Sequence, residues 1–383
     1  MLGIDNMMIA CGTGFVCVAL IILNVTSVAI AIRRAKPRAT PLPAPANAPG
    51  VTIVRPVCGI DNFCEQTLGS SFRLDYPIYE VIFCCARAND PVVPVVERLI
   101  AAHPEVPARL IIGDEKVSAN PKLNNCVRGW DAAAYEWIIL ADSNVLMPGD
   151  YVQRMLASWG PKTGLVCSMP QGSRPQNIWA ELEIAILNTY QARWQYSADG
   201  IGTGFAQGKN MLWRRDVMDA GGGIRALAAE IAEDAASTKL VRRQGLKINL
   251  VDSPFEQPLG FRKFADVWLR QIRWARMRRK TFPGHYAPEI LADCATPTIL
   301  ASYTAHLLGW NVPFVAIATL GFLYLLEFVL ARANRWYFSW RMPFLFLLRD
   351  LMLPVIYVDA WLLDDFTWRG NSMSVREEER PST

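Results

Sequence analysis

Carboxylate and amide side chains follow the ends of apolar segments at several places in this chain. Asp142 comes directly after the apolar segment 135–141, and Ser143 and Asn144 follow it. The oxygens of Asp142 and Asn144 are of the kind that Mg²⁺ or Mn²⁺ prefers, and such an ion can hold a diphosphate. A simpler role for Asp142 is to cap the turn after the strand.

Two further acidic positions have a similar placement. Asp90 follows the segment 79–86 and precedes Pro91, and Glu233 and Asp234 open a segment with helical spacing. Each has a structural explanation, since an acid can cap a helix or complement the helix dipole. Acids in three loops of one sheet are, however, more than capping requires.

Basic residues are concentrated in the segment 264–282, which contains the pattern Arg270, Arg273, Trp274. In a helix these three residues lie on one side, so the two arginines can bind an anion. Neutralising a leaving diphosphate would be a use for them. The alternative is an amphipathic helix that lies on anionic headgroups through Arg276, Arg278, Arg279 and Lys280.

The elements that must position these residues alternate between strands and helices. Strands are predicted at 51–59, 79–86, 108–114 and 135–142, with a helix at 91–103. This alternation predicts an α/β domain with a mostly parallel sheet and helices on both faces. Ligands of such sheets bind beyond the carboxyl ends of the strands, where Asp90 and Asp142 are expected.

Membrane segments are predicted at both ends of this domain. The hydrophobic share is 52%, and residues 7–32 contain no charge, which is long enough for a transmembrane helix. Arg33, Arg34, Lys36 and Arg38 follow this segment, so the positive-inside rule places the next domain in the cytoplasm. Residues 294–326 also lack charge, and Asn311 and Pro313 should divide them into two helices. For 343–363, a membrane span and an interfacial helix are both open.

Composition excludes some classes of protein. The net charge of +4 gives no reason to expect a nucleic acid partner, and nine cysteines without a paired spacing predict neither a disulfide framework nor a zinc site. Gly202, Gly204 and Gly208 suggest a glycine-rich turn or a place where backbone approaches a sugar. The oligomeric state is not set by these patterns.

In combination these motifs resemble the ceramide glucosyltransferase family of GT-A glycosyltransferases. The motifs are RPVCGIDN, the Asp before Pro91, NPKLNN, D-S-N, GTGFAQGKNMLWRRDV, E-D and R-x-x-R-W, across roughly 51–282. The resemblance implies a UDP-sugar donor, a membrane lipid acceptor and a divalent metal, Mg²⁺ or Mn²⁺. It implies that Asp234 is the general base and that Asp142, with Asn144, serves the metal and diphosphate. The positions implied to contact the nucleotide-sugar are Asp90, Lys122, Asp142, Arg270, Arg273 and Trp274.

The expected organisation follows from these observations. It comprises an N-terminal transmembrane anchor with a basic flank (1–36), a Pro-rich linker (37–50), a GT-A glycosyltransferase domain (51–260), an amphipathic interface region with R-x-x-R-W (261–290), C-terminal membrane segments (291–365) and a polar tail (366–383). We expect a multi-pass protein of a bacterial inner membrane, with its catalytic domain in the cytoplasm.

The leading functional hypothesis is an inverting transfer of a hexose from a UDP-sugar to a lipid hydroxyl, most simply glucose to ceramide. One alternative transfers N-acetylglucosamine to a hopanoid polyol such as bacteriohopanetetrol. Another is a polysaccharide synthase, although few membrane segments are available for a channel. From a different class, the chain could be a non-catalytic membrane adaptor, which would have no need of Asp90, Asp142 and Asp234 together.

Overall fold

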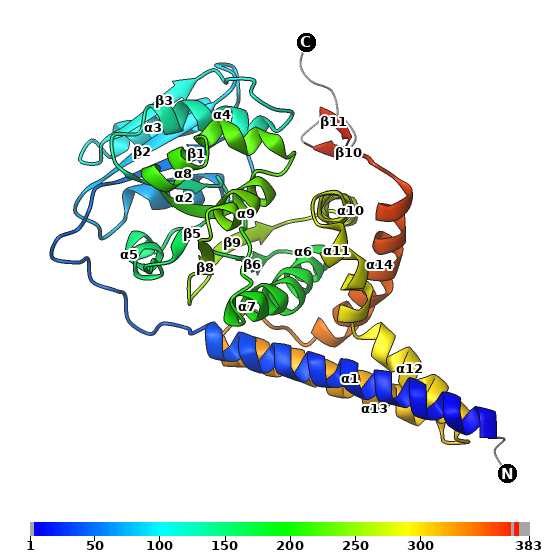
Figure 1. Ribbon diagram of the computed structural model, residues 1–383. Coiled ribbons are helices and arrows are strands. Elements are labelled where there is room, and N and C mark those ends of the chain that lie inside the picture. The colour runs from blue at the N-terminus through cyan, green and yellow to red at the C-terminus, as the bar shows by residue number, and fades with distance from the viewer. Residues whose placement is uncertain (1–3, 369–370, 375–383) are drawn as a thin grey trace. The chain divides into compact units, whose positions relative to one another are not determined.

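A computed structural model describes residues 4–368 and 371–374, and contacts divide the described chain into two units. Residues 34–177 and 198–261 form the sheet unit, and residues 4–33, 178–197 and 262–374, apart from 369 and 370, form the helical unit. The segment 178–197 thus interrupts the sheet unit in sequence and groups with the C-terminal helices. Figure 1 labels the elements of both units.

A seven-stranded sheet is the centre of the sheet unit. Its strand order is β3-β2-β1-β4-β7-β5-β8, and β7 alone among these runs antiparallel to its neighbours β4 and β5. The strands are β1 (Val51–Pro56), β2 (Tyr79–Cys85), β3 (Ala108–Ile112), β4 (Trp137–Ala141), β5 (Thr163–Cys167), β7 (Asn210–Arg214) and β8 (Lys247–Leu250). A small parallel pair joins β6 (Pro170–Pro175) and β9 (Phe255–Gly260). The predicted mostly parallel sheet is confirmed, and its first four strands lie where the apolar segments placed them.

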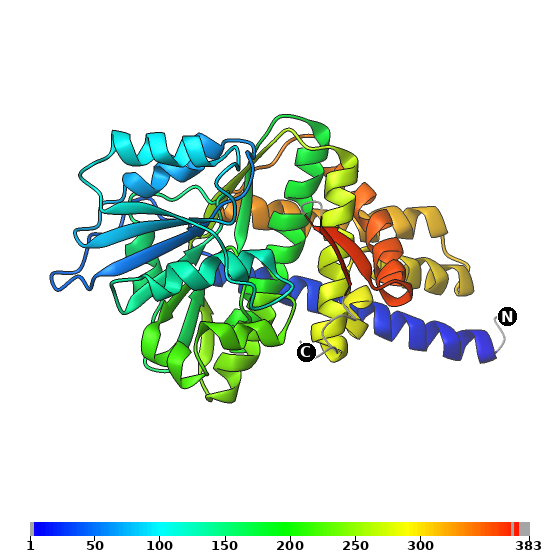
Figure 2. The same ribbon diagram turned by 90° about the horizontal axis from the view of Figure 1, so that it is seen from above.

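Helices cover both faces of this sheet, as Figure 2 shows for α2 and α3 on one face and α4 on the other. Every residue of β1 and β2 is buried, and successive side chains point to opposite faces, so Ile53 and Phe83 pack in the cluster with α3. On the opposite face α4 approaches so closely that a Cβ at Gly129 would lie 2.5 Å from Val54. The helices of this unit are α2 (Cys64–Gly69), η1 (Ser70–Phe72), α3 (Val93–Ala102), α4 (Pro121–Asp131), α5 (Tyr151–Ala157), α8 (Arg215–Ala220), η3 (Ile224–Ala229) and α9 (Glu233–Arg243).

The helical unit contains the long apolar helices. Within the described residues, two helices are long and apolar enough to cross a membrane, Asp5–Arg34 and Val312–Ala333. Asn311 caps the second by accepting from Phe314 N at 3.0 Å, so the predicted break at Asn311 and Pro313 is confirmed. The elements are α1 (Ile4–Arg34), α6 (Ile178–Ile184), the π-helix η2 (Ala185–Gln191), α7 (Ala192–Gly200), α10 (Phe264–Thr281), α11 (Pro283–Tyr286), η4 (Ala287–Ala292), α12 (Ala295–Leu307), α13 (Val312–Ala333), α14 (Met342–Leu362), β10 (Asp365–Trp368) and β11 (Asn371–Ser374).

The structure describes the expected Pro-rich linker and part of the expected polar tail. The Pro-rich segment 37–50 forms neither helix nor strand, as predicted, but it is bound along the sheet unit. Arg38 pairs with Asp252 at 2.5 Å, and Leu42 N donates to Asp150 at 2.9 Å, because these acids offer partners for its polar groups. Of the expected polar tail (366–383), 369–370 and 375–383 lie outside the described residues, while 366–368 and 371–374 belong to the antiparallel strands β10 and β11.

A buried arginine ties β1 to the turn that follows β4. Arg55 has no exposed surface, and its guanidinium donates to Thr67 O and Ser71 Oγ at 2.7 and 2.6 Å. It also donates to the backbone oxygens of Asp142 and Val145 at 2.8 and 3.0 Å. Burial lowers the pKa of Arg55 to about 10. A cation without exposure is stable here only because oxygens surround it, and these contacts fix the position of Asp142.

Replacing Arg55 by Met should therefore destabilise the sheet unit by about 2–4 kcal/mol, because buried carbonyl groups lose their donors. The measurement is the free energy of unfolding of the detergent-solubilised protein. Arg214→Met is the matched control: this arginine is 44% exposed and pairs with Asp216, so its loss should cost less than about 1 kcal/mol. Equal losses for the two variants would contradict the structural role given to Arg55.

Candidate functional site

Acidic residues meet at the carboxyl edge of the sheet. The strand β4 ends at Ala141, so Asp142 is the first residue beyond it. The strands β2, β1 and β4 are neighbours and run parallel, so Asp90, in the loop after β2, lies at the same edge. Two strand spacings, about 10 Å, separate the ends of β2 and β4. The loops that follow β2 and β4 therefore lie at the same edge of the sheet, as predicted.

Two lysines hold the carboxylate of Asp142. Lys122 Nζ lies 2.6 Å from Asp142 Oδ1, and Lys209 Nζ lies 2.8 Å from Asp142 Oδ2. Burial alone would raise the pKa of Asp142, but the two ammonium groups hold it well below its usual range. Lys122 also pairs with Glu233 Oε1 at 2.6 Å, and these acids keep the pKa of Lys122 above its usual range despite burial. Asp142 and Lys122 are therefore charged at neutral pH.

The NPKLNN motif positions Lys122. Asn120 is the N-cap of α4: its Oδ1 accepts from Lys122 N at 2.9 Å and from Leu123 N at 3.2 Å. Pro121 fits the first turn because its missing N–H would have no partner there. Asn120 also donates from Nδ2 to Glu233 Oε2 at 2.6 Å, which links α4 to the start of α9. The motif thus starts helix α4 and places Lys122, the second residue of that helix, in the site.

Glu233 and Asp234 form the first turn of α9, as predicted. Asp234 Oδ2 accepts from Gly208 N at 3.2 Å, and its Oδ1 accepts from Ala235 N at 2.8 Å. Burial, reinforced by the negative charge of Glu233, raises the pKa of Asp234 to about 6. A carboxylate of this pKa is a stronger base than an ordinary aspartate and is mostly ionised at neutral pH.

The glycines of the segment GTGFAQGK allow close backbone approaches. A Cβ at Gly208 would lie 2.8 Å from Glu233 Oε1 and 3.4 Å from Asp234 Oδ2. One at Gly204 would lie 2.4 Å from Ile248 O, and Gly202 has a φ of +80°. Gly202 and Gly204 therefore serve the turn and its packing, whereas Gly208 brings the chain against the acids of α9.

Asp90 has a partner in the neighbouring loop. Its carboxylate accepts from Gly59 N at 2.8 and 3.1 Å, and from Val92 N at 2.9 Å, at the start of α3. It therefore caps the segment before α3 and also holds the loop of the RPVCG motif. A nucleotide contact by Asp90 stays a prediction.

The predicted metal ligands are already engaged. Lys209 Nζ lies 3.2 Å from Asn144 Oδ1 as well as 2.8 Å from Asp142 Oδ2, and Lys122 takes the other Asp142 oxygen. Within residues 4–368 and 371–374, no three His, Cys, Asp or Glu side chains form a group that could hold a metal ion. A divalent ion on the same oxygens would lie against two ammonium groups. In this arrangement Asp142 and Asn144 do not fit a bound Mg²⁺ or Mn²⁺.

The remaining predicted residues, Arg270, Arg273 and Trp274, lie on α10 in the helical unit. Arg270 pairs there with the buried Glu183, which Arg262 also approaches at 3.4 Å. Arg273 and Trp274 are partly exposed. Their contacts with the diphosphate and acceptor stay predictions.

The alternative that α10 binds anionic lipid headgroups is weakened, because most of the basic residues it depends on are paired with acids. Arg276 pairs with Asp359 at 2.6 Å, Arg278 pairs with Glu289 at 2.6 Å, and Arg279 pairs with Asp364. These acids belong to the same unit, so three of the four basic residues that this interpretation needs are neutralised.

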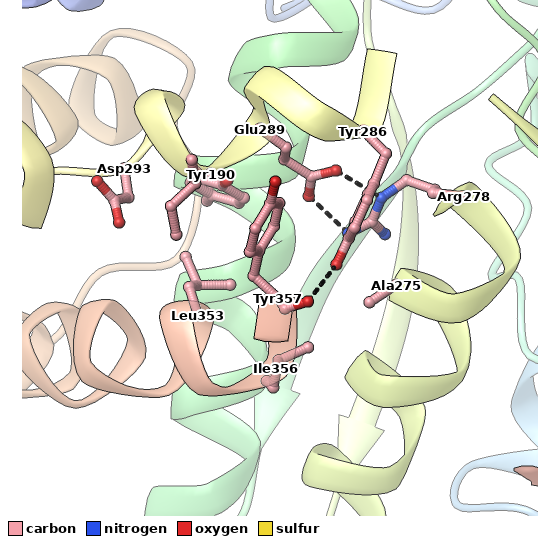
Figure 3. Close-up of a pocket in the computed structure, with 10 residues that line it drawn as sticks. Tyr190, Ala275, Arg278, Tyr286, Glu289, Asp293, Leu353, Ile356 and Tyr357 are labelled. Atoms are coloured by element: carbon pink, nitrogen blue, oxygen red, sulfur yellow. Dashed lines mark hydrogen bonds and ion pairs between the residues drawn. The ribbon is translucent and has the colours of Figure 1, made fainter. Parts of the chain in front are cut away.

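A small cavity in the helical unit lies beside the Arg278–Glu289 pair (Figure 3). Its volume is about 20 Å³, and Tyr190, Tyr286, Tyr357 and Asp293 are among its lining residues. A space of this size holds one water molecule and not a sugar ring. This cavity is therefore too small to serve as the sugar-binding site.

The charged cluster comprises Lys122, Asp142, Lys209, Glu233 and Asp234. Two of its members were not predicted from the sequence. Lys209 stands in the quoted glycine-rich segment but received no role, because its proximity to Asp142 depends on the antiparallel pairing of β7 with β4. Glu233 was noted only as the neighbour of Asp234, although it binds Lys122 and Asn120. The available signal was a charged residue within a quoted motif: Glu233 precedes Asp234, and Lys209 follows Gly208.

Comparison with known proteins identifies the family and the fold. The model of the family "Glycosyl transferase family 21" matches residues 15–381. Ceramide glucosyltransferases 3 and 1 of Caenorhabditis elegans are each 26% identical over 85% of this chain and 72% of their own length. The solved mannosyltransferase PcManGT from Pyrobaculum calidifontis, in complex with GDP-Man and Mn²⁺, is 17% identical with a TM-score of 0.52, over 91% of this chain and 98% of its own.

The structural likeness confirms the predicted GT-A fold. The family match confirms the resemblance inferred from the motifs and the assignment as a glycosyltransferase enzyme, because it covers the sheet, the charged cluster and α10. The chain belongs to glycosyl transferase family 21.

Proposed function

We propose that this glycosyltransferase moves a hexose from a UDP-sugar to the hydroxyl group of a membrane lipid, with inversion at the anomeric carbon. Ceramide is the leading acceptor and glucose the leading sugar, because relatives covering most of the chain are ceramide glucosyltransferases. The two candidate membrane spans are consistent with an acceptor whose tail stays in lipid.

The observation that carries the proposal is the pairing of a base with cations at one sheet edge. Asp234 has a pKa of about 6 and is bonded to Gly208 N, and Gly208 is followed directly by Lys209. Lys122 and Lys209 supply positive charge beside it. Displacement at an anomeric carbon needs both parts: a base for the acceptor and stabilisation of the departing diphosphate.

The proposed step balances as a single displacement. The acceptor oxygen forms a bond to the anomeric carbon while the bond from that carbon to the diphosphate oxygen breaks. The acceptor proton moves to Asp234, and UDP leaves with the bonding electrons. Among the contacts of the described residues, each Asp234 oxygen accepts one backbone N–H, so a lone pair remains for the acceptor hydroxyl.

The proposed step does not use a divalent metal ion. The mannosyltransferase of similar fold is described with Mn²⁺, which supports a divalent ion for this chain. Because Asp142 and Asn144 do not fit the ion in the present arrangement, no part of the step is assigned to it. The lysines alone provide the charge described here.

Asp234→Asn should lower the rate of transfer by about 10²–10⁴-fold while UDP-sugar binding stays near that of the wild type, because the amide keeps the shape and loses the base. Single-turnover rates and calorimetric binding measure the two effects. Asp216→Asn is the control, since Asp216 also lies in the first turn of a helix but is 58% exposed and outside the site. Normal turnover by Asp234→Asn would remove this residue from the mechanism.

The pH dependence of kcat/KM should also report the ionisation of Asp234. With a pKa of about 6, Asp234 is protonated on the acid side, so kcat/KM should fall below about pH 6 and level off above it. Glu233→Gln removes a negative charge that raises this pKa, so the acid limb should move to lower pH. A profile that stays flat from pH 5 to pH 8 in the wild type would contradict the role of Asp234 as base.

The test of the whole proposal is a lipid assay. Purified protein is incubated with a lipid extract and a panel of UDP-sugars, with Mg²⁺, with Mn²⁺ or with EDTA, and the lipids are weighed by mass spectrometry. One hexose added to ceramide is the expected result. An N-acetylhexosamine added to a hopanoid polyol would show that the sugar and the acceptor differ from those proposed. A polymer product would indicate a polysaccharide synthase. No mass increase with any donor would favour the non-catalytic membrane adaptor. Asp234→Asn protein is the control for contaminating activity.

A further inference from the structure

We propose that Lys209 is a built-in cation for the donor diphosphate, placed between Asp142 and Asn144, so that this chain binds its nucleotide without a divalent metal ion. This inference rests on the proposed function, because it names how the donor of that reaction is held. It concerns only residues of the sheet unit.

The pairing of β4 with β7 places Lys209 by backbone register. Ala141 is paired with Asn210, and one residue further Asp142 N donates to Lys209 O at 3.0 Å. Residues opposite each other in an antiparallel pair direct their side chains to the same face, so Lys209 is delivered beside the Asp142 carboxylate. The position is therefore set by the sheet and does not depend on a mobile surface loop.

The ammonium of Lys209 bridges both residues that were predicted to bind a metal. It lies 2.8 Å from Asp142 Oδ2 and 3.2 Å from Asn144 Oδ1, and its side chain is only 15% exposed. One positive charge thus engages a carboxylate and an amide oxygen that a hard cation would use. A divalent ion could bind these oxygens only if Lys209 moved away, which would expose a like charge to it at close range.

Lys209 also has donor capacity that Lys122 lacks. The three protons of Lys122 are matched by Asp142, Glu233 and Gly208 O. The partners described for Lys209, Asp142 and Asn144, match two of its three protons, so one remains for a phosphate oxygen. The geometry therefore favours Lys209 over the predicted Lys122 as the lysine that contacts the diphosphate.

Charge balance points the same way. Lys122 lies between two acids, Asp142 and Glu233, whereas Lys209 is paired with Asp142 alone, which it shares with Lys122. Positive charge at Lys209 is thus the less compensated of the two. A diphosphate placed there would gain a charge-assisted hydrogen bond, which is stronger than a neutral one.

The test is UDP binding to the full-length protein in detergent, measured by calorimetry in EDTA and again with Mn²⁺. The wild type should bind UDP in EDTA, with an affinity within about threefold of that with Mn²⁺. Lys209→Met should bind UDP about tenfold or more weakly in EDTA, because the charge-assisted contact is lost. Lys247→Met is the matched control: this exposed lysine at the start of β8 should leave both affinities unchanged.

A second readout follows Mn²⁺ itself by electron paramagnetic resonance, without nucleotide. Lys209→Met should bind Mn²⁺ about tenfold or more tightly than the wild type, because the oxygens of Asp142 and Asn144 are released. If Lys209→Met is unstable, Lys209→Gln, which keeps a hydrogen-bond donor but has no charge, is used in its place. The thermal unfolding midpoint shows whether each variant is folded.

Several outcomes would overturn the inference. Loss of wild-type UDP binding in EDTA with recovery in Mn²⁺ would show that the metal is required, and this arm needs no variant. Unchanged UDP binding by a folded Lys209→Met protein would remove Lys209 from the site. Failure of the wild type to bind UDP in either condition would instead reject the proposed donor, and the inference with it.

Discussion

The central constraint on this structure is the concentration of Asp142, Glu233 and Asp234 at one sheet edge. Three carboxylates in a partly buried place repel one another and lose solvation, so counter-charges must accompany them. Lys122 and Lys209 supply these charges, and Asp142 is held ionised between them. Asp234 touches neither lysine in the described contacts and keeps a raised pKa. The same cluster thus shifts the pKa values of Asp142 and Asp234 in opposite directions, which suits the proposed role of Asp234 as a base.

Local devices in three distant parts of the chain make this cluster possible. Arg55 fixes the turn after β4, Asn120 starts α4 so that Lys122 faces the site, and Gly208 lets β7 approach α9. Each device satisfies backbone groups that would otherwise be unpaired at the end of a strand or helix. The motifs RPVCG, NPKLNN and GTGFAQGK therefore have structural causes as well as a functional one, and a substitution in any of them acts on the same charges.

The sequence predicted those parts of the molecule that depend on local pattern. Strands β1 to β4, the start of α9 at Glu233 and the break at Asn311 follow from apolar runs, acids in a first turn and a capping Asn before Pro. What escaped prediction depends on long-range pairing. Lys209 faces Asp142 only because β7 enters the sheet antiparallel beside β4. Arg270 of α10 pairs with Glu183 and Arg276 pairs with Asp359, which lie 87 and 83 residues away along the chain.

Buried charge in the helical unit obeys the same rule. Glu327 lies on the mostly apolar helix α13 and is fully buried. Arg349 of α14 meets both of its oxygens, at 2.6 and 2.8 Å, and pairs with Asp350 at 2.8 Å. Either charge without the other would cost several kcal/mol, so α13 and α14 are obliged to pack together. This explains why the segment 343–363, considered alone, is neither a clear membrane span nor a surface helix. Arg349 is matched by Glu327 of the preceding helix, and Asp359 is matched by Arg276 of α10.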